Sequence, residues 1–540
     1  MPSRVNDSAT RQRSPTVNPI PTMLGLLLVA CATVAKPTDQ HASHVAVLAK
    51  AGIVEDSGYW NTHAVPGQTC AGERVGGLLL RCGRVFGPAG DLPAALVLLR
   101  KRKVTWNDYW VENAKAGRTC RGEYVGTVIR LIGTRLADQE LARRHAPPEG
   151  VIPLPEPSAF ASLPGGRFPS WGNAVIGTQT FGVSYQFTEQ PKLVETALAI
   201  QQMGASVIKF QLSHRYFGER GNIPERNGAI RTLVDLARDE PAHRQVLDMP
   251  FRHIVLWAHC LGNKQLPSWR KGFTAEERKT EYSEIKELTV HLLKTYSGSG
   301  KTFYLGHWEG DGWLRRSVHR ENDVRVTAEA AKGFTEWLNL RQQAVDDAKR
   351  ETKHSGVEVW NYLELNHVWL AMQGRPALVN AVLPNTTVDL VSYSSYDTAS
   401  DPARLKAALN YIESKLPPKP GITGRRVFIG EYGFPAARHT PKEQDRLSRQ
   451  LIQAALEWGC PLVLYWELYN NEVEDGRQRG FWMIDDQGVK QPVYQTHRAF
   501  YDEARAYAAT FQKKHGRLPD SNAFRRWAVA WLKQRGEALD

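Results

Sequence analysis

Two glutamates follow short apolar runs and lie among aromatic residues and glycines. Glu309 lies in the segment LGHWEGD (305–311), and Glu431 lies in FIGEYGFP (428–435). A carboxyl group is costly to bury, so its presence at the end of an apolar strand needs a partner or a purpose. Two carboxyls on opposite sides of one opening suit glycosidic cleavage, in which one protonates the leaving oxygen and the other meets the anomeric carbon.

Three further carboxyl groups have comparable surroundings and stay open as alternatives. Glu364, in YLELNH (362–367), could be the acid in place of Glu309, and Asp311 and Glu467 are weaker candidates. Aromatic residues recur in YSSYD (393–397) and YWELY (465–469). The cysteines and histidines show no metal-ligand spacing, so we expect neither a metal site nor an organic cofactor.

The elements that would position these residues repeat eight times from Trp171 onward. Each unit is a short apolar or β-branched run, a loop and an amphipathic helix. The pattern predicts a (β/α)8 TIM barrel over 171–505, with its chemistry at the carboxyl ends of the strands. A doubly wound open sheet is the alternative, but no Gly-rich phosphate loop follows the first strand. The predicted strands are 174–181, 206–212, 253–257, 302–307, 357–363, 388–393, 426–430 and 461–466.

Helix starts can also be read between the strands. Thr188, Asp401 and Thr440 are predicted to cap helices, and the last two are followed by proline. The C-terminal tail, 506–540, is predicted to be helical, and its 523–533 stretch is amphipathic and basic.

The region 172–500 resembles the clan A retaining glycoside hydrolases. The resemblance rests on the strand order and on the GEYGFP and YWELY segments. The resemblance implies a double displacement at a β-glycosidic bond, with Glu309 as acid/base and Glu431 as nucleophile. It also implies that Tyr393 or Tyr396 hydrogen-bonds the nucleophile and that Trp466 lies beneath the sugar. The remaining positions implied to bind the carbohydrate are His214, Arg215, His259, His307, Trp308 and Glu467.

One position departs from the family pattern. The clan usually has Asn immediately before the acid/base, whereas this chain has Trp308. Three interpretations follow: the substrate contacts differ, Glu364 is the acid, or the barrel has lost activity and only binds glycan or serves as an envelope structural protein.

The first 35 residues resemble an export signal. Arg4, Arg11 and Arg13 precede the apolar stretch 23–30, which is much shorter than the roughly 20 residues of a membrane span. The segment LVAC (28–31) resembles a bacterial lipobox, which predicts lipidation of Cys31 and membrane attachment; plain cleavage after Ala35 is the alternative. The interpretation that competes with an export signal is that 23–30 is simply an apolar stretch of a cytosolic protein. We expect an exported protein of the extracellular space or cell envelope.

A duplicated module occupies 46–146. Residues 59–76 and 109–126 share ten of 18 positions, including Tyr-Trp, Thr-Cys and Gly-Glu pairs, so the similarity indicates a duplication. The apolar stretches 75–80 and 125–132 that end the copies are predicted strands. Cys70 and Cys120 could form a disulfide in an oxidising compartment, leaving Cys82 unpaired. Trp60 and Trp110 fit packing better than glycan or wall-polymer contact.

The charge distribution argues against nucleic-acid binding. The net charge is +13, and residues 1–150 contribute over half of it, with 19 Lys and Arg against 12 Asp and Glu. The excess is scattered rather than concentrated in a basic run, so it hints at contact with an anionic envelope polymer. Between the module and the barrel, seven prolines in residues 147–170 predict a semi-rigid linker.

Overall fold

A computed structural model of the chain describes residues 37–105, 108–144, 175–214, 230–263, 269–315 and 326–539. The chain divides into two compact units between Ala137 and Asp138. The predicted signal with Cys31, the 147–170 linker and Arg215 lie outside the described residues. Among the helices that are described, none combines the length and the apolar character needed to cross a membrane.

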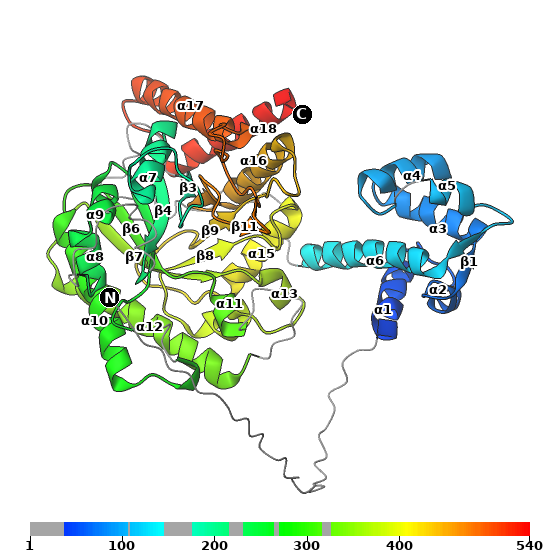
Figure 1. Ribbon diagram of the computed structural model, residues 1–540, viewed down its shortest axis with the longest axis horizontal. Coiled ribbons are helices and arrows are strands. Elements are labelled where there is room, and N and C mark those ends of the chain that lie inside the picture. The colour runs from blue at the N-terminus through cyan, green and yellow to red at the C-terminus, as the bar shows by residue number, and fades with distance from the viewer. Residues whose placement is uncertain are drawn as a thin grey trace, which may run out of the picture. The chain divides into compact units, whose positions relative to one another are not determined.

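In the first unit, each sequence repeat forms a short helix, a three-residue strand and a longer helix (Figure 1). An additional helix precedes the first copy, and another connects the two copies. The elements are α1 (Pro37–Lys50), α2 (Ser57–His63), β1 (Thr69–Ala71), α3 (Gly72–Arg84), α4 (Leu92–Lys101), α5 (Tyr109–Asn113), β2 (Thr119–Arg121) and α6 (Gly122–Arg144).

The prediction that 75–80 and 125–132 are strands is wrong, because these stretches lie inside α3 and α6. Their buried residues recur at positions i, i+3, i+4 and i+7, which is the period of a helix. These residues are Val75, Leu78, Leu79 and Cys82 in α3, and Val125, Val128, Ile129 and Ile132 in α6. The strands β1 and β2 lie immediately before these helices.

The core of the module contains the repeated aromatic and cysteine positions. Trp60 and Trp110 are 3% and 1% exposed, as the packing interpretation predicts. β1 and β2 pair antiparallel, with Cys70 directly opposite Cys120. Both thiols and that of Cys82 are free and buried.

The two copies also contact each other through their backbones. The N–H of Gly72 donates to the carbonyl of Arg118, and the N–H of Gly122 donates to that of Gln68, each at 2.8 Å. A Cβ atom on either glycine would lie 2.3 Å from a carbonyl oxygen of the other copy. Each copy therefore requires glycine where its long helix begins, because the other copy's loop approaches so closely.

The second unit contains a closed barrel of eight parallel strands, which confirms the predicted (β/α)8 architecture and excludes an open sheet (Figure 1). The order around the barrel is β10-β3-β4-β5-β6-β7-β8-β9, so the last strand pairs with the first. Every strand overlaps its predicted run. The strands are β3 (Ile176–Gln179), β4 (Val207–Leu212), β5 (His253–Ala258), β6 (Thr302–Gly306), β7 (Glu358–Leu365), β8 (Leu390–Ser394), β9 (Val427–Tyr432) and β10 (Val463–Tyr465).

Helices surround the barrel, and a small hairpin follows its last strand. Helix α17 runs across residue 505, and α18 packs against α16, so the tail joins the barrel core. The elements are α7 (Lys192–Met203), α8 (Leu233–Asp239), α9 (Pro241–Asp248), η2 (Trp269–Lys271), α10 (Ala275–Thr295), α11 (Gly310–Arg315), α12 (Ala328–Glu351), α13 (Val368–Met372), α14 (Leu378–Ala381), η3 (Leu383–Asn385), α15 (Pro402–Lys415), α16 (Pro441–Trp458), β11 (Val473–Glu474), β12 (Arg477–Gln478), α17 (Pro492–His515) and α18 (Ser521–Leu539).

Two of the three predicted helix caps are confirmed. The side chain of Asp401 accepts hydrogen bonds at the start of α15, and Thr440 forms a capping box at the start of α16. Thr188 does not cap α7, which begins after Pro191. Its hydroxyl instead donates to the carboxylate of Glu195 within that helix.

Side chains along each strand alternate between the helices and the barrel interior. The interior cluster contains Val207, Val255, Trp257, Tyr304, Tyr362, Leu390, Phe428 and Leu464. The same alternation places Lys209 two residues after Val207, and Glu364 two residues after Tyr362, on the inner side. Charged groups therefore lie beside the apolar and aromatic side chains of the interior.

Candidate active site

Glu431 reaches the barrel interior at an irregularity of β9. Two successive residues of β8 pair with Ile429 and Glu431, so Gly430 is an extra residue, as in a β-bulge. A Cβ atom at Gly430 would lie 1.7 Å from the hydroxyl oxygen of Ser392, which explains the glycine before the glutamate. The bulge lets Glu431 turn inward instead of toward the helices.

The carboxyl group of Glu431 has two polar partners and is 2% exposed. Its Oε1 lies 3.1 Å from Nζ of Lys209, and its Oε2 accepts a hydrogen bond from the hydroxyl of Tyr396 at 3.2 Å. Tyr393, the other predicted partner, instead bonds Asp397 and Thr398. Tyr396 is thus the tyrosine that contacts this carboxyl.

Glu309 lies between β6 and α11 and is 8% exposed. The side-chain amide of Asn366, which follows β7, donates to its Oε2 at 2.8 Å. Its backbone N–H donates to Oε1 of Glu364 at 3.2 Å. Both contacts come from the β7 end, which therefore fixes the position of Glu309.

Glu364 is wholly buried, and both of its oxygens are engaged. Oε1 accepts from the backbone of Glu309, while Oε2 accepts from Nζ of Lys209 at 2.8 Å and from the hydroxyl of Ser392 at 2.8 Å. Both oxygens of Glu364 are thus held by donors of the protein itself.

Lys209 was not among the predicted site residues, although it lies in the second predicted strand. It is wholly buried, and its Nζ contacts Glu364, Glu431 and the carbonyl oxygen of Gly430, the last at 3.2 Å. Nζ also lies 4.7 Å from the centre of the Trp257 ring. The sequence could have indicated this position, because a lysine two residues after an inward-facing valine in a strand also faces inward.

The surroundings of the two candidate carboxyls differ in charge. Burial raises the pKa of Glu431, the ammonium group of Lys209 opposes this increase, and the charge of Glu364 adds to it. Burial raises the pKa of Glu309 well above its ordinary range, and the charges of Glu431, Glu364 and Asp311 raise it further. Because no cation of the described residues contacts Glu309, whereas Lys209 contacts Glu431, Glu309 keeps its proton to higher pH than Glu431.

Aromatic side chains gather at the same end of the barrel. The Trp466 ring lies 5.3 Å from that of Phe181 and 6.0 Å from that of Trp257, measured between centres. Its indole N–H donates to Glu472 at 3.2 Å. Half-buried Trp308 packs against the same cluster. The structure thus brings together Glu309, Glu431, Tyr396, Trp308 and Trp466.

His307 and Glu467 lie deeper and bond the backbone. The two ring nitrogens of His307 contact the carbonyl of Trp308 at 2.8 Å and the N–H of Glu364 at 3.3 Å. Burial lowers the pKa of His307 well below its usual value, so the ring is neutral. Glu467 accepts from the N–H of Phe181 at 2.9 Å, and burial raises its pKa well above the ordinary range. Both residues brace the strand ends.

The other two predicted histidines lie closer to the surface. His259 is half-buried, and its ring lies edge-on to Trp313 with 5.5 Å between centres. His214 is exposed and directly precedes the undescribed segment that begins with Arg215.

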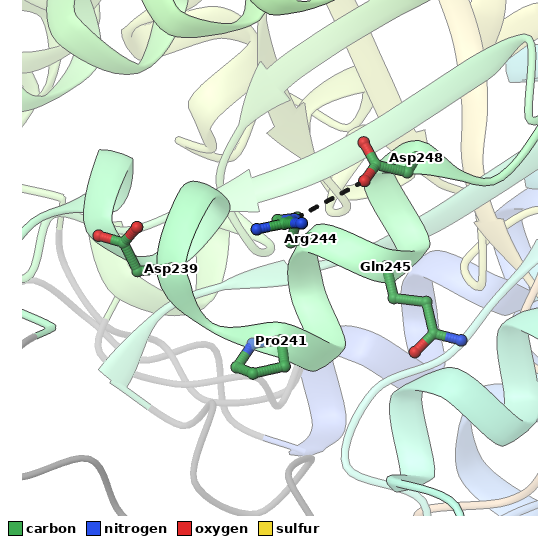
Figure 2. Close-up of a pocket in the computed structure, with 5 residues that line it drawn as sticks. All are labelled: Asp239, Pro241, Arg244, Gln245 and Asp248. Carbon is green, nitrogen blue, oxygen red and sulfur yellow. Dashed lines mark ion pairs between the residues drawn. The ribbon is translucent and has the colours of Figure 1, made fainter.

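A hollow on α8 and α9 involves none of the predicted site residues. Figure 2 shows its lining, with an ion pair of 3.9 Å between Arg244 and Asp248. All of its lining residues are exposed, so the hollow is a surface feature. They are Asp239, Pro241, Arg244, Gln245 and Asp248. Among the described residues, no three His, Cys, Asp or Glu side chains gather in a way that could hold a metal ion.

No known family model and no curated protein match this sequence. Solved structures similar to it include a GH5_18 protein from Bifidobacterium longum subsp. infantis, with 14% identity and a TM-score of 0.42 over 61% of this chain and 79% of that one. A family 39 glycoside hydrolase from Bacteroides cellulosilyticus WH2 has 11% identity and a TM-score of 0.41, over 62% and 65%.

An exo-beta-1,4-mannosidase from Opitutaceae bacterium strain TAV5 has 12% identity and a TM-score of 0.43, over 66% of this chain and 62% of that one. This chain spans less than two thirds of the length of the family 39 protein and of the mannosidase. At these low values the likeness assigns no activity, which has to come from the chain's own side chains.

Proposed function

We propose that the chain is a glycoside hydrolase that cleaves a β-glycosidic bond in an oligo- or polysaccharide with retention of configuration. One observation carries the proposal: Glu309 and Glu431, at the ends of two strands of one barrel, have unlike partners. Glu431 contacts the Lys209 ammonium, whereas Glu309 contacts a neutral amide and faces carboxylates. Surroundings that separate the protonation of two carboxyls suit an acid beside a nucleophile.

In the first half of the reaction, a carboxylate oxygen of Glu431 attacks the anomeric carbon. The bond from that carbon to the leaving oxygen breaks, and the proton of Glu309 moves to the leaving oxygen. The sugar is then esterified to Glu431, and Glu309 carries the negative charge.

In the second half, Glu309 acts as a base. It takes a proton from water, whose oxygen attacks the anomeric carbon and displaces Glu431. This step returns both carboxyls to their starting protonation. Retention requires the two carboxyl groups to stand about 5–5.5 Å apart, whereas inversion requires about 6.5–9.5 Å.

The aromatic cluster supports a sugar substrate. Trp466, Trp257 and Phe181 form a set of rings beside Lys209 and Glu431. The apolar faces of pyranose rings pack on such side chains. The indole N–H of Trp257 is buried, and none of the described residues accepts a hydrogen bond from it. Trp308 stands where the clan usually has Asn, and the amide of Asn366 contacts Glu309 from the next strand.

The decisive test is a hydrolysis screen of the full chain against β-linked oligo- and polysaccharides. Glu431→Gln removes the nucleophile and is expected to reduce turnover by about 10⁴-fold or more. Glu329→Gln makes the same chemical change at an exposed site on α12 and is expected to leave turnover unchanged. A nuclear magnetic resonance time course of the first-formed anomer tests retention, and an inverted product would refute the double displacement.

A glycan-binding barrel without activity is the alternative function. In that case no substrate is turned over, and Glu431→Gln changes glycan affinity only modestly. A barrel mouth that tolerates substitution without loss of either hydrolysis or binding would instead indicate a structural role.

Export and lipidation accompany this proposal. The Arg-flanked apolar segment and the LVAC motif support export and acylation of Cys31. Labelling of cells with a palmitate analogue tests the anchor, with Cys31→Ser as the control. Label that persists in the variant would refute attachment at this residue. Contact between the duplicated module and an anionic envelope polymer is a separate proposal, supported by the basic excess of residues 1–150.

A further inference from the structure

Lys209 is a buried cation that takes no part in the bond changes of the double displacement. Its ammonium group has three N–H donors and three acceptors, namely Glu364 at 2.8 Å, Glu431 at 3.1 Å and the Gly430 carbonyl at 3.2 Å. The side chain is wholly buried. A lysine in such a place is stable only with matched negative charge and complete hydrogen bonding.

Glu364 is the second member of this arrangement. One of its oxygens contacts Lys209 and Ser392, and the other accepts the backbone N–H of Glu309. It therefore touches both the cation beside the nucleophile and the backbone of the acid. Because all of these contacts are within the protein, Glu364 can keep them throughout the reaction.

The charges in this cluster move during the proposed reaction. In the free enzyme, Lys209 lies between two carboxylates. When Glu431 forms its bond to the anomeric carbon it becomes a neutral ester, and Glu309, having protonated the leaving oxygen, becomes negative. Lys209 then loses the charge of Glu431 as a partner, and Glu364 is the one carboxylate of the described residues that remains in direct contact with it.

We propose that Lys209 and Glu364 form a permanent ion pair of two positioning residues, which holds Glu431 as a carboxylate before attack and leaves no unpaired buried cation after it. The inference rests on the proposed function, because it assigns parts to a reaction at Glu309 and Glu431. Glu364 additionally anchors the backbone of Glu309, so the pair connects the two reacting groups.

The proposal predicts shifts of opposite sign for its two members. Lys209→Met removes the cation beside Glu431, so ionisation of Glu431 and the acid limb of kcat/KM should move to higher pH by about one unit or more. Glu364→Gln removes a like charge, so the same limb should move to lower pH. The double variant should lie between the two. Simple loss of packing would not produce opposite shifts.

Other groups that face Glu431 are unchanged in these variants. They surround its carboxyl from four strand ends, and their charges are common to all of the proteins compared. These groups are Tyr362 of β7, Glu309 after β6, Tyr396 after β8 and Glu467 after β10.

Lys301→Met is the matched control. Lys301 is also buried, but it directly precedes β6, and its Nζ bonds the backbone carbonyls of Leu247, Met249 and Phe251. It thus lies at the strand end opposite to the carboxyls. We expect this variant to lower thermal stability without moving the acid limb.

Infrared titration of the full chain makes the test independent of turnover. The carbonyl band of a protonated carboxyl, taken as the difference between each protein and its Glu431→Gln counterpart, reports the ionisation of Glu431 together with its effect on the neighbouring Glu309. We expect its midpoint to rise in Lys209→Met and to fall in Glu364→Gln. Midpoints that stay fixed or move in the same direction would overturn the proposal. If Lys209→Met does not fold, the direction of the midpoint shift in Glu364→Gln still tests the proposal.

The combined results separate the two proposals. Opposite shifts of the infrared midpoints without hydrolysis of any glycan would support the ion pair and refute the hydrolase. Hydrolysis with an acid limb that neither variant moves would support the hydrolase and refute the ion pair.

Discussion

The barrel interior and the core of the duplicated module bury different kinds of groups. In the barrel, Lys209, Glu364 and Glu431 are buried together with aromatic rings. In the described part of the module, Thr105 is the one polar or charged side chain that is buried, and the core is otherwise tryptophan, cysteine and aliphatic residues. A buried charged group needs a partner of opposite charge or a hydrogen bond, whereas an apolar side chain needs neither. The core of the module is therefore held by apolar packing, without such pairs.

The contrast indicates where stability and chemistry reside. In the module, the two copies pack closely through backbone contacts at Gly72 and Gly122. In the barrel, hydrophobic residues of similar volume could replace the whole charged cluster without loss of stability. Changes in the barrel cluster should therefore affect activity, and changes in the module core should affect stability alone.

After Glu431→Gln, the largest expected effect is on activity, from Glu309→Ala. Loss of the acid should slow hydrolysis of an unactivated glycoside by about 10²–10⁴-fold. Azide should restore turnover of an aryl glycoside with a good leaving group, because such a substrate needs no acid and azide needs no base. A rate that survives Glu309→Ala and is instead lost in Glu364→Gln would assign the acid to Glu364.

The next effect is on module stability, from Trp110→Ala. Removal of this buried ring should destabilise the module by about 3–5 kcal/mol, while the hydrolysis rate of the barrel stays unchanged. Calorimetry of the full chain would follow the two units. Val111→Ala is the control, because that neighbouring side chain is 55% exposed. If hydrolysis were lost when the module unfolds, the expectation that the module core affects stability alone would be wrong.

Oxidation of the module should have a somewhat smaller effect. Directly opposite residues of an antiparallel pair have Cα atoms about 4.5–5.5 Å apart, within the range of a disulfide, so Cys70 and Cys120 can be joined. Glutathione disulfide would accept the two electrons, releasing two glutathione molecules and leaving one cross-strand bond. We expect a stabilisation of about 2–4 kcal/mol.

The oxidation should be slow in the folded protein. Burial raises the pKa of Cys70 to about 12 and that of Cys120 to about 11, so few thiolates are present near neutral pH. Peptide mapping after alkylation should find Cys82 still reduced. A bond that joins Cys82 to another cysteine, or no bond after transient unfolding with oxidant, would refute the pairing.

The smallest effect is expected in the wall of the barrel. Thr440→Ala removes the capping box of α16 and should cost about 1 kcal/mol in thermal or denaturant unfolding. Lys442→Ala, at an exposed position of the same turn, is the control. The ratio of turnover to enzyme concentration should be the same in both variants, because neither residue touches the carboxyl cluster.

The barrel could be predicted because its strands are continuous apolar runs separated by capped helices. The strand ends followed from those runs, which is why Glu309 and Glu431 could be chosen. Lys209 lies inside such a run and was missed, since lysine in a strand usually faces water. Period-two alternation from Val207 would have placed it inward.

Other features depended on contacts that one sequence does not contain. The bulge at Gly430 exists only relative to the register of β8, and it decides where Glu431 points. The choice between Tyr393 and Tyr396 likewise depended on the path of the loop after β8. In the module, the apolar stretch 75–80 is short enough to fit a strand, and the helical spacing of its buried residues extends beyond it to Cys82.

The closure of the barrel by β3 and β10 has a consequence for synthesis. The N–H of Phe181, just after β3, bonds Glu467, just after β10, across 286 positions of the chain. Before β10 has left the ribosome, the other strands can form only an open sheet with two unpaired edges. Such edges can pair with strands of other chains. The carboxyl cluster is therefore enclosed in a complete barrel only late in translation, when the final strand closes the ring.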